Sequence, residues 1–256
     1  MKFLSQIIET LPDGRVIEVC IGIYWTAVVV EVADQRMCGL CATLSSGHIH
    51  GEKQGPSVPK AGRLGGGSGR DLAALALGKT GVQKSIGVAA LNALLPRQPH
   101  LWKDANAEQI ITDHGAGRRV VMVGHFPFVD RLRSSVGELV VLELEPSPGD
   151  IPADEAPRVI PDAEVVAITG MTLVNHTLPK LLELCAPDSL VILMGPSTPL
   201  SPILFDHGID ILSGAVVLDI ESVLKVVSQG GNFRQVHRSG VRLVNIRGSQ
   251  VVQGQA

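Results

Sequence analysis

The spacing of apolar residues divides the chain into two parts with different periodicities. In residues 1–102, short runs bounded by turn residues predict strands, and stripes at three- and four-residue spacing predict helices. The expected strands span 15–23, 25–32 and 36–43, and the expected helices span 71–77 and 82–95. Ala33-Asp34-Gln35 predicts a hairpin between the last two strands. Strands followed by helices are typical of a small α+β domain.

Residues 103–256 change to continuous apolar runs rich in β-branched residues. These runs are 119–123, 139–142, 165–169 and 190–194. Strands buried on both faces of a parallel sheet have this pattern. Segments able to form helices separate the runs, most clearly 105–113 and 178–185. The sequence therefore predicts a doubly wound α/β domain, whose ligand would lie beyond the carboxyl ends of the strands.

The first residues resemble neither a signal peptide nor a membrane span. Apolar residues recur at helical spacing from Phe3 to Leu11, with polar residues between them, so an amphipathic helix is expected. No stretch of the sequence reaches 18 uninterrupted apolar residues. The 4 cysteines are too sparse for a disulfide scaffold. A cytoplasmic, reducing location is the expectation.

Composition excludes several classes of protein. Of the 256 residues, 45% are apolar and 18% are charged, which indicates a globular chain. The net charge of −3 gives no basic field for nucleic acid or anionic lipid, and 3% aromatics are too few for a base-stacking surface. A small molecule is therefore the expected partner, without nucleic acid or membrane, and a homo-oligomer is left open.

Two positions after the first two parallel strands concern cofactor binding. Gly124-His125-Phe126-Pro127 lacks the three spaced glycines of a dinucleotide fingerprint, so NAD or FAD bound in the usual way is disfavoured. Glu143 ends the second strand, where an acid can accept a hydrogen bond from a ribose hydroxyl. A tight turn is the alternative explanation for Gly124.

Polar loops follow the third and fourth parallel strands. Residues 169–177 are dense in hydroxyl and amide groups, and Thr177 is expected to cap the following helix. Residues 195–202 contain three prolines that preorganise the loop. Because the two loops should lie side by side, we expect them to bind a ligand. The expected binding residues are Gly124, His125, Phe126, Glu143, Thr169, Gly170, Thr172, Asn175, Gly195, Pro196, Ser197 and Thr198.

The spacing of Cys38 and Cys41, with His48, His50 and Glu52 following, is similar to that of metal ligands. Residues three apart on a strand point to opposite faces, so the two thiols should not converge on one ion. A structural role is the expectation for this pair.

Longer blocks of sequence resemble the putative heavy-metal-chelation family. They are residues 168–178 and 194–202, the loop 124–127, Glu143, and residues 208–214 and 86–94. The resemblance covers nearly the whole chain and implies an enolase N-terminal-like domain, residues 1–102, before a Rossmann-like domain, residues 103–256. Met171 stands where the family usually has Thr, and His176 occupies a variable position.

The family resemblance implies a site between the two domains and a role in heavy-metal chelation and metal homeostasis. Our first hypothesis is a protein that binds a small polar molecule, or a metal ion or chelate, in that cleft. The alternative is an enzyme of cofactor or metallophore biosynthesis, acting on pterin- or flavin-like molecules by condensation, hydrolysis or methyltransferase-like chemistry. His125 or Glu143 would then be the general acid or base. A scaffold without ligand is the third hypothesis.

Overall fold

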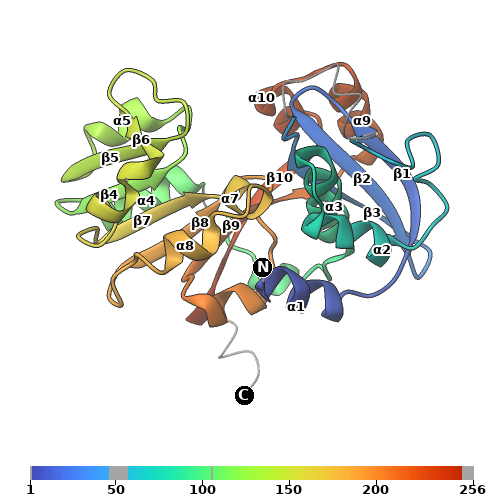
Figure 1. The fold of residues 1–256 in the computed structure, drawn as a ribbon, viewed down its shortest axis with the longest axis horizontal. Coiled ribbons are helices and arrows are strands. Elements are labelled where there is room, and N and C mark those ends of the chain that lie inside the picture. Colours follow the sequence, from blue (N-terminus) through green and yellow to red (C-terminus); the bar gives the residue numbers. More distant parts are fainter. Residues whose placement is uncertain (1, 46–56, 105, 250–256) are drawn as a thin grey trace. The chain divides into compact units, whose positions relative to one another are not determined.

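The computed structural model describes residues 2–45, 57–104 and 106–249 (Figure 1). Contacts between residues divide the chain into two compact units. The first unit comprises 1–98, 199–201 and 215–242, and the second comprises 99–198, 202–214 and 243–256. Within the described residues, no helix is long and apolar enough to cross a bilayer. The predicted α+β and α/β folds are confirmed, whereas the domain boundary after residue 102 stays a prediction.

The described residues of the first unit contain a three-stranded antiparallel sheet and six helical segments. The strands are β1 (Arg15–Ile21), β2 (Trp25–Val32) and β3 (Gln35–Ala42), in that order across the sheet. The helical segments are α1 (Lys2–Thr10), α2 (Gly69–Ala73), the 3₁₀ helix η2 (Ala74–Leu77), α3 (Gly81–Leu94), α9 (Ile220–Ser228) and α10 (Phe233–Arg238). The predicted amphipathic helix is α1, which buries Phe3, Leu4 and Ile7.

The turn between β2 and β3 confirms the predicted hairpin. Val32 pairs with Gln35, so Ala33 and Asp34 form a two-residue turn. Both turn residues have positive φ, 48° and 62°. This is the backbone of a type I′ turn, whose twist matches the flanking strands. The sheet register is therefore fixed by two residues.

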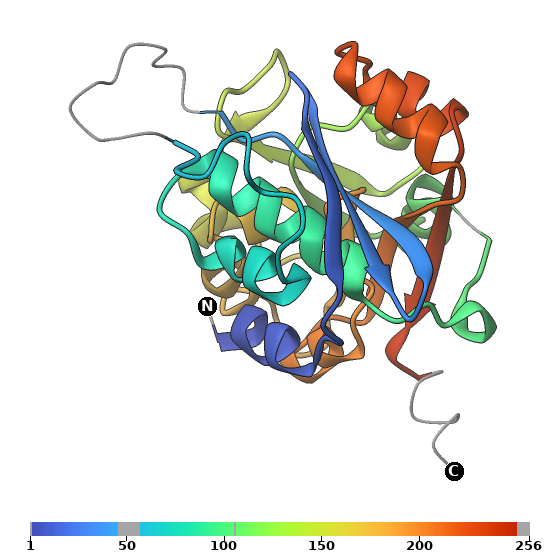
Figure 2. The ribbon, with the colours of Figure 1, turned by 90° about the vertical axis from the view of Figure 1, so that its right-hand side faces the viewer.

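Helix α3 packs closely against one face of this sheet (Figure 2). Gly39 makes the approach possible, because a β-carbon there would lie 2.2 Å from the carbonyl oxygen of Ala89. Ser85 donates to the carbonyl of Ala42 at 3.0 Å and accepts from the amide of Leu44 at 2.9 Å. These bonds satisfy a buried hydroxyl and fix the helix at the end of β3.

The opposite face of the sheet is covered by α9 and α10, which come from residues 215–242. Asp219 caps α9, and Asn232 forms a capping box with Gln235 at the start of α10. One apolar cluster joins these helices to the sheet and includes Ala27, Val29, Cys38, Leu40, Val217, Val223, Val227, Val236 and Val241. The sheet of the first unit is thus buried between helices distant in sequence.

The second unit is built on a mostly parallel sheet, seven-stranded in the described residues, with the order β10-β9-β8-β7-β4-β5-β6. The strands are β4 (Arg119–Val123), β5 (Glu138–Glu143), β6 (Ile151–Pro152), β7 (Val165–Thr169), β8 (Leu190–Met194), β9 (Ile211–Val217) and β10 (Val241–Arg247). The last two contain points where the chain passes between the units. The four predicted parallel strands are confirmed as β4, β5, β7 and β8.

Short helices connect the strands of the second unit. They are η3 (Pro99–Leu101), α4 (Ala107–Gly115), α5 (Val129–Arg133), η4 (Ala153–Glu155), α6 (Ala156–Val159), α7 (Met171–Val174), α8 (Leu178–Leu182) and η5 (Pro202–His207). Consecutive residues of β4, β7 and β8 are buried, so both faces of the sheet are covered. Helices α4 and α5 contribute Ile110, Ile111, Val129 and Leu132 to this core.

Candidate functional site

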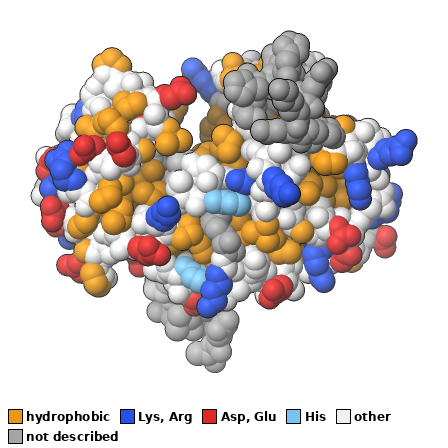
Figure 3. Space-filling model, viewed as in Figure 1, with side chains coloured by type: hydrophobic (Ala, Val, Ile, Leu, Met, Phe, Trp, Pro, Cys, Tyr) orange, Lys and Arg blue, Asp and Glu red, His pale blue; other side chains and the backbone are white. Residues whose placement is uncertain are grey.

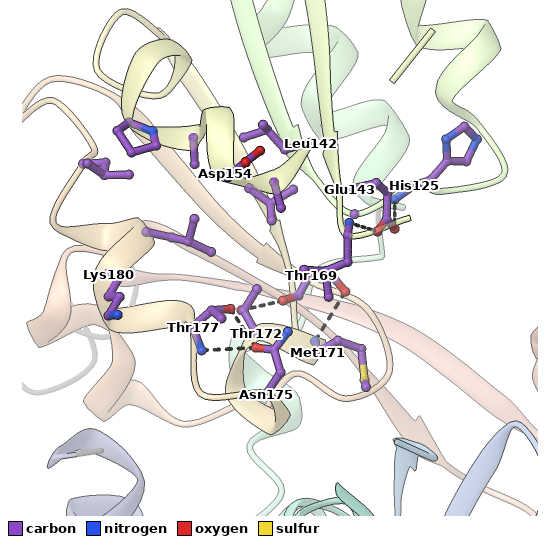
Figure 4. Close-up of a pocket in the computed structure, with 18 of the residues that line it drawn as sticks. His125, Leu142, Glu143, Asp154, Thr169, Met171, Thr172, Asn175, Thr177 and Lys180 are labelled. Atoms are coloured by element: carbon purple, nitrogen blue, oxygen red, sulfur yellow. Dashed lines mark hydrogen bonds between the residues drawn. The ribbon is translucent and has the colours of Figure 1, made fainter. Parts of the chain in front are cut away.

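A pocket of about 510 Å³ opens at the carboxyl ends of β4, β5 and β7. All of its residues belong to the second unit. It is lined by Val123, Gly124, His125, Phe126, Leu142, Glu143, Leu144, Ala153, Asp154, Ala156, Pro157, Thr169, Met171, Thr172, Asn175, Thr177, Lys180, Leu181 and Leu184 (Figure 4). Most of these side chains are apolar, and a few polar groups lie among them.

The strand order explains the position of the pocket. From β4 the chain proceeds to β5 and β6 on one side, then crosses to β7 and β8 on the other. The loops after β4 and β7 therefore leave the sheet in opposite directions and open a crevice between them. Open α/β sheets bind ligands at such a switch point. The pocket lies at the carboxyl ends of the strands, one of the two places expected from the sequence, whereas the expected site between the two domains stays a prediction.

Gly124 makes the first turn of the pocket. Its φ is +103°, a conformation that side chains other than glycine disfavour. A β-carbon on Gly124 would lie 3.0 Å from Cβ and Cγ2 of Thr169 on the neighbouring strand. The amide of Gly124 donates to the carbonyl of Leu142 at 2.9 Å, which extends the pairing of β4 with β5. The glycine thus lets the two loops approach each other.

Glu143 is held rigidly at the end of β5. Its Oε1 accepts a hydrogen bond from the His125 amide at 2.9 Å, and its Oε2 accepts one from the Leu144 amide at 2.7 Å. Figure 4 shows the carboxylate between these two loops. Each carboxylate oxygen retains acceptor capacity, because an ionised carboxylate offers about four lone-pair sites. The group is a preoriented acceptor for ligand hydroxyls.

The side chain of His125 is bound to a buried acid. Its Nδ1 lies 2.8 Å from Oδ2 of Asp150, whose side chain is 0% exposed, and Ser147 donates its amide to the same oxygen at 3.1 Å. Arg133 lies 3.8 Å from Oδ1 of Asp150. In Figure 4 the imidazole points away from Thr169, Thr172 and Asn175. This pair joins the loop after β4 to the loop after β5.

The loop after β7 supplies a set of hydroxyl and amide groups. Thr172 donates its hydroxyl to the carbonyl of Thr169 at 2.7 Å, and the amide of Met171 donates to the Thr169 hydroxyl oxygen at 3.3 Å. Asn175 Oδ1 accepts from both the amide and the hydroxyl of Thr177, at 3.1 and 2.7 Å. Among the described residues, Asn175 Nδ2 has no acceptor, and its two hydrogens remain as donors for a ligand.

The expected cap of α8 by Thr177 is wrong. The backbone of Thr177 is helical, with φ −92° and ψ −17°, and its side chain makes no capping hydrogen bond. The hydroxyl is instead donated to Asn175, because that acceptor lies two residues away in a tight turn. The side chain of Thr177 therefore orients Asn175 and does not cap the start of α8.

The structure brings part of the predicted site into this pocket. The predicted residues that line it are Gly124, His125, Phe126, Glu143, Thr169, Thr172 and Asn175. The others lie outside it: Gly170, Gly195, Pro196, Ser197 and Thr198. The expectation that the two loops are neighbours is confirmed, because a β-carbon on Gly170 would lie 2.7 Å from Oγ1 of Thr198.

The hydroxyls of Ser197 and Thr198 are buried beneath α7. Their residues are 3% and 2% exposed, and Ser197 Oγ lies 3.6 Å from Sδ of Met171. Because Gly170 has no side chain, Thr198 has room beside it. The proline-rich loop therefore supports the helix that carries Thr172, and Met171 contacts that support through its sulfur.

Sequence reasoning missed the wall formed by η4, α6 and α8. These helices contribute Ala153, Asp154, Ala156, Pro157, Lys180 and Leu181, and Leu184 lies in the turn after α8. Apolar residues on short helices are also typical of a core, so their pattern did not distinguish a pocket wall. Lys180 and Asp154 add one charge of each sign to the lining, and the face of this unit in Figure 3 likewise mixes both signs.

Of the candidate metal ligands in the first unit, the structure describes Cys38 and Cys41. Cys38 and Cys41 are both buried in β3, three positions apart. Burial raises the pKa of the Cys38 thiol to about 12, so it stays protonated at neutral pH. His48, His50 and Glu52 lie outside the described residues. Among the residues that are described, no three His, Cys, Asp or Glu side chains converge as metal ligands.

The fold and the pocket define the class of this protein. It is an α/β protein that has a Rossmann-like sheet with a pocket at its switch point, together with an α+β unit. The chain belongs to the DUF364 family, described as "Putative heavy-metal chelation", whose sequence model matches residues 106–245. A second model with the same description, DUF4213, matches residues 4–95. The family expected from the sequence is thereby confirmed.

Comparisons with individual proteins agree with this family. The chain is 26% identical to an uncharacterised protein of Methanocaldococcus jannaschii over 87% of this chain and 86% of that one. A DUF364 crystal structure from Desulfitobacterium hafniense matches with TM-score 0.79 and 27% identity, over 96% of this chain and 98% of that chain. One from Pyrococcus horikoshii, 21% identical, has the same fold with TM-score 0.79 over 96% and 98% of the two chains.

Proposed function

We propose that the chain binds a small polar organic molecule, alone or as a metal chelate, in the pocket at the switch point of the second unit. The observation that carries this proposal is the combination of apolar walls with fixed polar groups at the edge where α/β sheets hold ligands. Glu143 is anchored by two amides, and Asn175 is anchored by Thr177. Preorganised groups of this kind lose little entropy on binding.

A chelate fits the pocket better than a bare ion. The lining acids are Glu143 and Asp154, and no third His, Cys, Asp or Glu joins them as a metal site in the described residues. A heavy metal ion held tightly needs several converging donors. The organic ligand would therefore bring most of the metal's donors, and the protein would bind its outer surface.

Native mass spectrometry of the freshly purified protein tests this proposal. We expect a retained organic mass, with or without a metal. The variant Ala153→Phe, which fills the pocket wall, should lose that mass, whereas Ala61→Phe on an exposed turn should retain it. Retention by both variants, or no adduct together with no ligand-induced rise in melting temperature, would contradict the proposal.

A second candidate function is an enzyme acting on the pocket ligand, and one observation favours it. The buried carboxylate of Asp150 contacts Nδ1 of His125, which orients the ring and leaves Nε2 for proton transfer. Turnover of a pterin- or flavin-like substrate that His125→Ala abolishes and Asp150→Asn reduces would support this candidate. Unchanged turnover in His125→Ala would exclude the imidazole as acid or base.

A further inference from the structure

We propose that the ligand of this pocket is a ribonucleoside, whose neighbouring 2′- and 3′-hydroxyls donate to the carboxylate of Glu143. This inference rests on the proposed binding function and names the ligand's chemical class. It combines four features of the pocket: a fixed carboxylate, its position in the sheet, an exposed apolar surface beside it, and a loop unsuited to a pyrophosphate.

The carboxylate of Glu143 is arranged to accept two hydroxyls at once. One amide hydrogen bond occupies each oxygen, at 2.9 and 2.7 Å, so both oxygens are fixed and both keep a lone pair. Two hydroxyls on adjacent carbons present two donors side by side. Hydrogen bonds from hydroxyls to an ionised carboxylate are stronger than those between neutral groups. A vicinal diol therefore matches the acceptor in number and charge.

The place of Glu143 in the sheet supports a ribose as the source of that diol. Glu143 is the last residue of β5, which pairs directly with β4, and it lies about 20 residues after Gly124. In doubly wound sheets an acid at this distance from the first turn binds the ribose hydroxyls of a nucleotide. The geometry is retained here although the glycine fingerprint is absent.

An apolar surface for the base lies next to Glu143. Leu144 is 73% exposed, unusual for a large apolar residue, and it lines the pocket. Ala153, Ala156 and Pro157 line it as well. An exposed apolar surface at a pocket is typical of a binding site. A flat base on this surface would cover Leu144, and Asp154 offers an acceptor for an exocyclic amine.

The loop after β4 does not provide a pyrophosphate site. In dinucleotide folds, free amides of a glycine-rich turn bind the phosphates at a helix N-terminus. Here the His125 amide already donates to Glu143, and Pro127 has no amide hydrogen. Donors that remain include the Asn175 amide and Lys180, on the β7 side of the pocket. A nucleoside with a polar or carboxylate-bearing 5′ substituent fits them.

Isothermal titration calorimetry of the full chain tests this inference with adenosine, guanosine, cytidine and uridine, and with their 2′,3′-dideoxy counterparts. We expect at least one ribonucleoside to bind and its dideoxy form to bind at least tenfold more weakly. Glu143→Gln should weaken the ribonucleoside to a similar extent and leave the dideoxy form unchanged. The losses of binding free energy from removing the hydroxyls and from removing the charge would then be non-additive, as expected for groups in direct contact.

The matched control is Glu145→Gln, which removes an exposed carboxylate two residues along the chain and outside the pocket, and which should leave the diol preference intact. Equal affinity for a ribonucleoside and its dideoxy form would overturn the inference, and this comparison needs no variant. D-ribose binding as tightly as the nucleoside would overturn the role of the apolar surface. If no nucleoside binds while native mass spectrometry still finds a ligand that Ala153→Phe removes, the diol inference fails and the proposed function stands. If that ligand is absent too, both fail.

Discussion

Gly124 and Thr169 approach so closely that a β-carbon on Gly124 would lie 3.0 Å from two side-chain carbons of Thr169. The φ of Gly124 is +103°, so an added methyl group meets both backbone strain and a contact. We expect Gly124→Ala to lower the free energy of unfolding by about 1–3 kcal/mol and to distort the pocket. Urea denaturation measures the first effect.

Gly117→Ala is the matched control for this contact. Gly117 also has a positive φ, +71°, but a β-carbon there would meet nothing within 4 Å. Its expected cost is about 1 kcal/mol, from the left-handed backbone alone. Equal losses in the two variants would show that the approach to Thr169 adds no strain.

His125 and Asp150 should be energetically coupled. The Asp150 side chain is fully buried, and the imidazole is its contact at 2.8 Å. Replacing Asp150 with Asn should cost about 1–3 kcal/mol, because a buried network loses its charge and hydrogen bonds. In a double-mutant cycle, Asp150→Asn should lower the free energy of unfolding less when His125 is already replaced with Ala than in the unmodified protein. Strict additivity of the two variants would contradict a direct interaction.

Asp13 should make stability depend on acid pH. Hydrogen bonds from the Arg70 amide, the Ser68 hydroxyl and the Gly14 amide hold the pKa of its carboxyl below the usual 3.8. Because the folded-state pKa is lowered, the stabilisation is complete above that ordinary value and is lost as pH falls through the folded pKa.

The variant Asp13→Asn tests this linkage, since its amide oxygen can still accept hydrogen bonds. Its melting temperature should be below that of the unmodified protein at neutral pH, and the difference should shrink as the pH falls below the ordinary pKa of 3.8. Asp188→Asn, in an exposed turn, serves as the control and should show no such narrowing. A constant difference across pH would refute the role of the Asp13 charge.

The cysteines should differ in reactivity. Burial raises the pKa of Cys38 to about 12 and that of Cys185 to about 11. Because the thiolate is the nucleophile, iodoacetamide near pH 8 should modify Cys185, which is partly exposed, well before Cys38. Mass spectrometry after tryptic digestion measures the order. Rapid native labelling of Cys38, at the rate found in urea, would show that β3 is not buried as described.

Residues 1–98 should not form a stable fold alone. One face of their sheet is covered by α9 and α10, and without them Ala27, Val29, Cys38 and Leu40 would be exposed. We expect the fragment to bind a hydrophobic dye and to aggregate. Joining residues 215–242 through a flexible Gly/Ser linker should restore a cooperative melting transition. A soluble 1–98 fragment with cooperative melting would refute this dependence.

Much of the fold could be predicted because local chemistry determines it. The β-branched runs of β4, β7 and β8 are buried on both faces and carry that information in their composition. The turn at Ala33 and Asp34 could be predicted as well, because the two expected strands on either side of it are joined by only a few residues. The helices that cover the first sheet could not be predicted. Helix α9 lies more than a hundred residues after this sheet in the sequence, and amphipathic periodicity does not indicate which surface a helix packs against.

The candidate site was predictable in its strand-end positions and not in its side-chain directions. Gly124 follows β4, and Glu143 and Thr169 are the last residues of β5 and β7, so all three lie at the carboxyl edge of the sheet. Ser197 follows a strand too, but its hydroxyl is turned toward Met171. A polar residue in a loop can face a ligand or support a neighbouring helix, and the sequence pattern is the same in both cases.

Because α9 and α10 come from residues 215–242, the ribosome synthesises them well after the sheet that they cover. The first sheet leaves the ribosome long before the residues that cover it, which begin about 120 positions after residue 98 and end about 145 positions after it. At about 5–20 residues per second, the apolar face stays uncovered for roughly 6–30 seconds. For that period the nascent chain carries an open β-sheet surface, and a chaperone that binds such surfaces would find its substrate there.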